Sequence, residues 1–178
     1  MPSSILHPPS SLVLSVANRQ RTKKINTRFL KQVVAEIFAE LKITDAELGV
    51  NLVGAEEMAR VNWQFLRHEG PTDVITFDHA APVAALVKAR TKSRTTFRAF
   101  TSAATSLHGE LFVCVDEAVS QAKNFKTSWQ AETVRYVVHG VLHLLGYDDL
   151  KPDLRRKMKR AENRLVRRLA GRFLFTRI

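Results

Sequence analysis

The sequence predicts an α+β fold with an α/β three-layer character, in which a small mixed sheet of four strands packs with about five helices. Three observations lead to this fold class. The chain has 178 residues with a hydrophobic content of 45%, enough for one apolar core. Segments with the alternation of strands are interleaved with segments that have the three- and four-residue spacing of amphipathic helices. Three helical segments then follow the last strand, a pattern typical of layered α and β folds.

Four segments have the composition of short strands, and two helices separate the first three of them. The strands are expected at 12–16, 48–53, 73–77 and 110–115. Thr27 can cap the first helix, whose single apolar stripe consists of Phe29, Leu30, Val33, Val34, Ile37, Phe38 and Leu41. The second helix is expected at about 55–66, with Met58, Val61, Asn62 and Phe65 facing inward. Gly70-Pro71 breaks that pattern, because proline restricts the residue before it.

Three more helices complete the predicted fold. Asp116 opens a helix that continues through Ala122. Ser128 can cap the next helix, which runs from residue 129 to 145 and stops at Gly146. The last helix is expected at about 152–170; it is strongly basic and has a narrow apolar stripe of Leu154, Met158, Leu165 and Leu169.

We expect residues 1–178 to form a single domain that carries a basic insertion at about 80–107. This segment is rich in Ala, Ser, Thr, Lys and Arg and contains no acidic residue. A connection of this length is usually functional or disordered. Cys114 is the one cysteine and lies in an apolar run, which predicts a buried, inert thiol rather than a disulfide.

The chain has no sequence feature of a membrane or secreted protein. No apolar run approaches the roughly 20 residues that a membrane-spanning helix needs. The first ten residues lack the basic start and apolar stretch of a secretion signal. We therefore expect a cytoplasmic protein that does not contact a membrane.

The net charge of +11 is concentrated in three places. Residues 151–178 hold 11 Lys or Arg residues against two acids, the insertion holds five more, and a third cluster lies at 19–28. Such surfaces attract polyanions, and counterion release makes the binding salt-dependent. This distribution favours a nucleic acid as the partner, although a solvated basic helix that serves solubility gives the same pattern.

A candidate metal site lies at the end of the helix expected at 129–145. His139 and His143 are four residues apart, so their side chains leave one face of the helix. Two imidazoles favour a divalent ion such as Zn²⁺, and Gly146 lets the chain turn back so that Asp148 or Asp149 can supply a third ligand. The alternative is a histidine pair without metal. In helical metalloprotease motifs a Glu follows the first His, whereas here Gly140 has no side chain, so the protease hypothesis loses its general base.

At these residues the sequence resembles the YbeY-type rRNA maturation endoribonucleases. The family pattern H-G-x-L-H-L-x-G-Y-D-H is matched from His139 at every fixed position except the last. The resemblance extends to Asn62, to the segment P-T-D-V-I-T-F at 71–77, to Gly109-Glu110 and to Gln121-Ala122. It implies a zinc-dependent hydrolase of single-stranded RNA that matures the 3′ end of the small-subunit rRNA, takes part in ribosome quality control and has the small ribosomal subunit as a partner.

The chain departs from the family pattern in two places. Asp149 stands where the family has its third histidine, and we expect its carboxylate to complete the metal site, with zinc or another divalent ion. Leu66 stands where the family usually has an Arg after a Tyr. Arg67 is the candidate replacement for that phosphate-binding Arg, but neighbouring residues point about 100° apart around a helix.

The remaining roles follow from this hypothesis. Asp148 would support the metal or accept a proton, unless it only closes the turn by bonding to its own backbone. The last helix would bind RNA through Arg155, Arg156 and Lys159. Thr72 and Asp73 could line the cleft or merely begin a strand, and His108 could lie near the metal.

A non-catalytic ribosome-assembly factor, with a structural metal and an RNA-binding surface, is the alternative function. Structural zinc sites usually have four protein ligands, so a three-ligand site argues against it.

Overall fold

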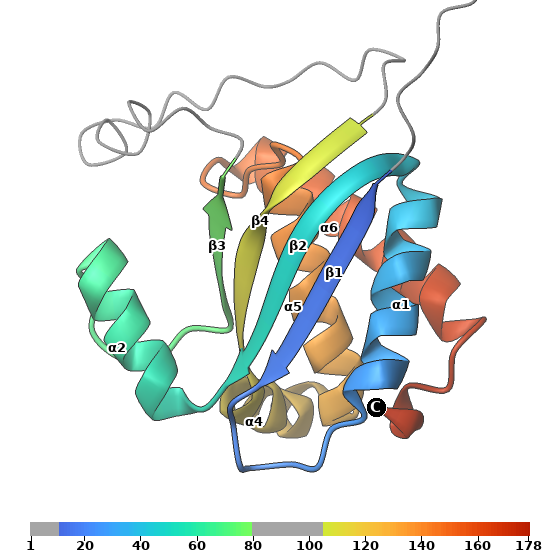
Figure 1. Ribbon diagram of the computed structural model, residues 1–178. Coiled ribbons are helices and arrows are strands. Elements are labelled where there is room, and N and C mark those ends of the chain that lie inside the picture. The colour runs from blue at the N-terminus through green and yellow to red at the C-terminus, as the bar shows by residue number, and fades with distance from the viewer. Residues whose placement is uncertain (1–10, 80–104) are drawn as a thin grey trace, which may run out of the picture.

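The computed structural model describes residues 11–79 and 105–178, which form a four-stranded mixed sheet and five α-helices (Figure 1). The strands are β1 (Leu12–Asn18), β2 (Ile43–Val53), β3 (Val74–Asp78) and β4 (Thr105–Cys114). The helices are α1 (Thr27–Glu40), α2 (Ala55–Leu66), α4 (Val115–Phe125), α5 (Trp129–Leu144) and α6 (Pro152–Ala170), and a short 3₁₀ helix (Phe175–Arg177) follows them. The predicted fold class is confirmed.

The strand order in the sheet is β1-β2-β4-β3, with three parallel strands and one antiparallel edge strand. β1 pairs with β2 and β2 with β4 in parallel, whereas β3 runs antiparallel to β4. Val50 lies opposite Val16 on one side and Leu111 on the other, and Thr76 lies opposite Leu111. This register places the inward-facing residues of all four strands on one face.

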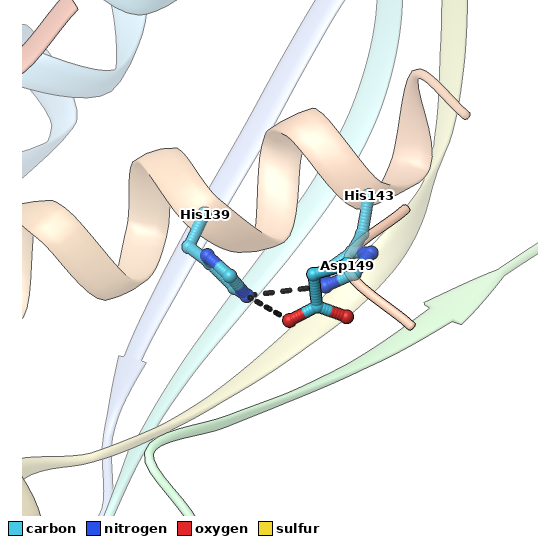
Figure 2. A group of neighbouring side chains, drawn as sticks. All are labelled: His139, His143 and Asp149. Atoms are coloured by element: carbon cyan, nitrogen blue, oxygen red, sulfur yellow. Dashed lines mark hydrogen bonds and ion pairs between the residues drawn. The ribbon is translucent and has the colours of Figure 1, made fainter. Parts of the chain in front are cut away.

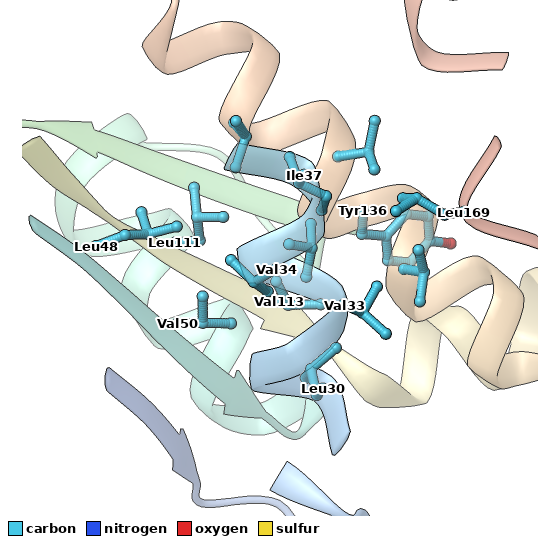
Figure 3. Close-up of a cluster of buried hydrophobic side chains, with 14 of the residues drawn as sticks. Leu30, Val33, Val34, Ile37, Leu48, Val50, Leu111, Val113, Tyr136 and Leu169 are labelled. Carbon is cyan, nitrogen blue, oxygen red and sulfur yellow. The ribbon is translucent and has the colours of Figure 1, made fainter. Parts of the chain in front are cut away.

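Helices cover that face and form the main core. α1 packs on β1 and β2, α5 packs on β3 and β4, and α6 packs against both helices. Figure 3 shows how α1 side chains such as Val34 and Ile37 meet Val50, Leu111 and Val113 of the sheet. A smaller cluster of Val53, Met58, Ile75 and Cys114 attaches α2 to the other face, and Cys114 is fully buried as predicted. Within the described ranges, no helix is long and apolar enough to cross a bilayer.

Two helix starts differ from the sequence prediction. α1 is capped by Asn26 rather than by Thr27, because the Asn26 side chain accepts a hydrogen bond from the Phe29 backbone amide at 3.0 Å, which leaves Thr27 inside the first turn. Asp116 lies in the first turn of α4, which begins one residue earlier than predicted. Its carboxylate accepts a hydrogen bond from the backbone amide of Ala55 at 2.6 Å and so caps α2, whose own N-cap is Gly54.

The strand boundaries also moved. β4 begins at Thr105, so the last residues of the segment assigned to the insertion belong to the sheet, where they pair with β2. The polar and small residues in 105–109 hid this strand from pattern analysis. Residues 80–104 of the insertion lie outside the described ranges. Phe65, predicted to face inward, is 55% exposed although its ring contacts Phe77 edge-to-face.

Candidate metal centre

α5 presents His139 and His143 from one face, close to the sheet. The Ser128 side chain caps this helix by accepting a hydrogen bond from the backbone amide of Ala131 at 3.1 Å, as predicted. Gly140 allows α5 to approach β4, because a Cβ at this position would lie 2.7 Å from the side chain of Leu111. The position that holds a glutamate in helical metalloproteases is therefore occupied here by close packing.

The turn after α5 brings Asp149 to the two histidines. Gly146 has a φ of +86°, the left-handed conformation that favours glycine, and its amide donates to the His143 carbonyl at 2.8 Å. The chain then returns so that Asp149 Oδ2 lies 3.9 Å from His139 Nε2 (Figure 2). One potential ligand atom from each of His139, His143 and Asp149 lies within 4.8 Å of the others.

The hydrogen-bond partners of the two imidazoles assign their protons. His139 Nδ1 lies 3.0 Å from a Glu162 carboxylate oxygen, and His143 Nδ1 lies 3.0 Å from the Tyr147 carbonyl oxygen. Both partners accept only, so each neutral ring carries its proton on Nδ1 and has an unprotonated Nε2. These two Nε2 atoms are 3.1 Å apart, and two facing lone pairs at this distance repel unless a cation lies beside them. The donor set therefore fits a metal ion bound through both Nε2 atoms and Asp149.

Glu162 anchors this arrangement from α6. Its side chain is 3% exposed and accepts from His139, from Lys159 at 2.9 Å and from Arg135 at 2.5 Å. Burial alone would raise the pKa of Glu162, but the hydrogen bonds from these three residues outweigh burial and lower it to about 2. The carboxylate is therefore ionised near neutral pH and can hold the His139 proton on Nδ1.

His143 is kept neutral by its surroundings. Burial lowers its pKa, the nearby His139 lowers it further, and the Asp149 carboxylate acts in the opposite direction. A neutral imidazole is the form that binds a metal.

A cavity of about 730 Å³ opens beside this centre. His139 and Asp149 form part of its wall, together with Arg155 and Lys159 of α6 and Arg135 of α5. Its size is within the usual range for small-molecule sites. Cationic groups therefore lie next to the candidate ligands, where a phosphate would need them.

Comparison with known proteins decides the family. The model of the family described as Endoribonuclease YbeY matches residues 15–170. The chain belongs to the endoribonuclease YbeY family. Endoribonuclease YbeY of Chlorobium phaeovibrioides is 31% identical over 142 residues, which cover 80% of this chain and 81% of that protein. Its namesake from Kineococcus radiotolerans is 39% identical over 121 residues, 68% of this chain and 63% of the relative.

A solved structure supports the fold. The solution structure of the Thermotoga maritima protein TM1509 superposes with a TM-score of 0.57 at 22% identity, covering 90% of this chain and 91% of that one. The family predicted from the sequence is confirmed, and with it the preference for a nuclease over a protease.

Within this YbeY-family fold, the predicted site residues fall into two groups. His139, His143 and Asp149 converge, and Arg155 and Lys159 line the cavity, as do Thr72 and Asp73. Arg156 is exposed on α6 and is not among the residues that line the cavity. Arg67 lies at the C-cap of α2, where its guanidinium stacks over the Trp63 ring 5.8 Å from the centroid, and it does not line the cavity either.

Two further expectations have structural outcomes. The Asp148 carboxylate accepts from the Leu150 backbone amide at 3.0 Å, which is the turn-closing role named as its alternative. His108 lies on the sheet, 3.6 Å from Asp45 and 3.8 Å from Glu47, and is not part of the ligand group.

Sequence reasoning missed Glu162 and Arg135. Glu162 was counted only as a rare acid in a basic helix. The available signal was its position, because it continues the apolar stripe of Met158, Leu165 and Leu169 at helical spacing, where a charged residue needs a buried partner.

Proposed function

We propose that this chain is a metal-dependent, single-strand-specific endoribonuclease that matures the 3′ end of the small-subunit rRNA and takes part in ribosome quality control, with Zn²⁺ as the metal and the small ribosomal subunit as a partner. The observation that carries the proposal is the pair of unprotonated Nε2 atoms 3.1 Å apart, with Asp149 beside them. Family membership supports the nuclease activity.

The residues around the site suit phosphodiester cleavage. His139, His143 and Asp149 would hold the ion, which when bound supplies Lewis-acid polarisation of the phosphate and a more acidic water. Three protein ligands leave a coordination position open, which favours a catalytic over a structural metal. Arg155, Lys159 and Arg135 are positioned to balance the charge that develops on the phosphate.

Two roles remain predictions. Asp148 would accept a proton with the oxygen atoms that its turn hydrogen bond leaves available, since a carboxylate can accept several bonds. Arg67 would contact phosphate groups of an RNA that extends over α2, outside the cavity. Arg155, Arg156 and Lys159 would bind the RNA backbone along α6.

The test is cleavage of a single-stranded RNA that carries the 3′ end of the small-subunit rRNA, with the same sequence in a duplex as comparison. We expect zinc-loaded protein to cut the single strand, a chelator to stop the cleavage and added zinc to restore it. His143→Ala should abolish cleavage, whereas His108→Ala, which changes a histidine outside the site, should not. RNA binding without cleavage, in protein that retains its metal, would favour the assembly-factor alternative.

A further inference from the structure

The cavity continues beyond the candidate metal ligands to an end with different chemistry. At that end its wall consists of Asp73 from the start of β3, Glu117, Gln121 and Phe125 from α4, and Tyr136 from α5. In a chain with a net charge of +11, two carboxylates beside an aromatic ring do not suit a phosphate. They suit a group that donates hydrogen bonds.

The Tyr136 hydroxyl gives an independent indication of a ligand. Tyr136 is 5% exposed, and its hydroxyl oxygen is buried without a hydrogen-bond partner among the described residues. Burial raises the pKa of Tyr136, and the nearby carboxylates of Asp73, Glu132 and Glu117 raise it further, so the hydroxyl keeps its proton. A buried hydroxyl left unpaired in a native protein calls for an explanation such as a ligand.

The two carboxylates keep capacity to accept. Asp73 Oδ1 accepts from the Thr72 hydroxyl and the Val74 amide, and Glu117 Oε1 accepts from the Gln121 side chain. Each carboxylate has about four lone-pair sites, so neither is saturated by these bonds. Glu132, by contrast, is 3% exposed and occupied by Thr127 and Arg135.

We propose that this end of the cavity is a nucleobase subsite that selects bases with an exocyclic amino group over uracil; the inference rests on the proposed function, because the base belongs to an RNA bound at the metal. An amino group of adenine, cytosine or guanine has two N–H donors, one for each of Asp73 and Glu117. Uracil has a single N–H flanked by two carbonyl oxygens, which the carboxylates would repel. Acidic side chains recognise the cytosine amino group in the same way.

The geometry joins the subsite to the metal. Tyr136 precedes His139 by three residues of α5, so both lie on one face and differ by ~4.5 Å along the helix axis. A nucleotide with its phosphate at the metal can therefore place its base against Tyr136. Phe125, which is 67% exposed, offers a ring on which such a base can stack.

The test measures base preference in binding and in cleavage. Titration of the zinc-loaded and metal-free protein with 5′-CMP and 5′-UMP, followed by NMR, should show CMP binding at least about tenfold tighter. Short single-stranded oligomers of C or A should be cut faster than U oligomers of equal length. Cleavage of all oligomers at one rate, with equal binding of both nucleotides, would overturn the subsite and leave the proposed function standing. Tighter CMP binding without cleavage of any RNA would support the subsite and contradict the proposed function.

Two variants test the named residues. Glu117→Gln replaces an acceptor by a donor of the same shape, so the CMP-to-UMP preference should fall about tenfold, while Glu47→Gln, on an exposed position of β2, should leave it unchanged. Tyr136→Phe removes only the hydroxyl and should weaken CMP binding. Unchanged base preference in Glu117→Gln and unchanged CMP affinity in Tyr136→Phe would overturn the proposal, because a correctly folded variant would then lack the recognition that it removes.

Discussion

The three candidate ligands are held in two different ways. His139 and His143 leave a helix whose Gly140 packs tightly against β4, and the Nδ1 atom of each ring has a fixed partner. Asp149 leaves a loop, its side chain is 39% exposed, and its contact with His139 is 3.9 Å long. The histidine pair is therefore preorganised by the fold, whereas the carboxylate is placed by the turn at Gly146.

This difference separates affinity from adaptability. Preorganised ligands bind without paying for their own ordering, so most of the metal affinity should come from the helix. A carboxylate on an exposed loop can adjust to the ion and is a harder ligand than the imidazole that the family pattern has at this position. We therefore expect the effects of substitution to decrease from the histidines to Asp149 and then to the residues behind them.

The largest effect should come from His139→Ala or His143→Ala. Each leaves one imidazole and a carboxylate, so zinc affinity should fall by more than the roughly 10–100-fold that loss of an outer-shell partner costs. Elemental analysis and chelator competition measure this, and the rise in melting temperature on adding zinc should disappear. His68→Ala, at an exposed position, is the control. Either variant with one metal per chain at parental affinity would refute the assignment of the helix pair.

The next effect concerns the loop ligand. Asp149→Ala should weaken zinc binding less than loss of a histidine does, and Asp149→His should retain or tighten it, because a softer nitrogen ligand replaces a carboxylate. Asp148→Ala, the neighbouring control, should keep the metal and mainly reduce turnover. If Asp149→Ala binds zinc as tightly as the parent chain, the third ligand is not Asp149, and the comparison between helix and loop fails.

The same contrast explains what could be predicted from the sequence. The histidine pair and the turn at Gly146 are local, within eight residues, so spacing and backbone preference identified them. Glu162 reaches His139 only because α6 packs on α5, and its partner lies 23 residues away. The cap of α2 by Asp116 joins residues 61 apart, and the first half of β4 is a strand because β2 pairs with it. Such contacts depend on tertiary packing, to which local patterns are blind.

Behind the ligands, Glu162→Gln tests how much of the preorganisation comes from α6. The carboxamide can still accept from His139 through its oxygen, but its NH₂ group then faces Lys159 or Arg135, so we expect zinc affinity to fall about 10–100-fold. Glu36→Gln is the control, because Glu36 pairs with Arg172 away from the site. Thermal unfolding of the metal-free proteins separates lost stability from lost affinity. Parental zinc affinity in Glu162→Gln would show that the helix holds His139 without it.

The smallest effect should distinguish the two ends of the basic helix. Arg155 and Arg156 lie near the metal-site end of α6 and have no carboxylate partner in the described residues, whereas Arg168 and Arg172 pair with Glu40 and Glu36 of α1.

Replacing either pair by glutamine removes the same charge. RNA affinity measured against salt should nevertheless lose a slope of about 0.9 per phosphate contact only for Arg155→Gln/Arg156→Gln, since the cations of the other pair are already neutralised by α1. The Arg168→Gln/Arg172→Gln variant should instead lose a little stability, ~1 kcal/mol or less per exposed pair. Equal salt slopes in the two variants would mean that net charge, and not the position of α6 beside the cavity, directs RNA binding.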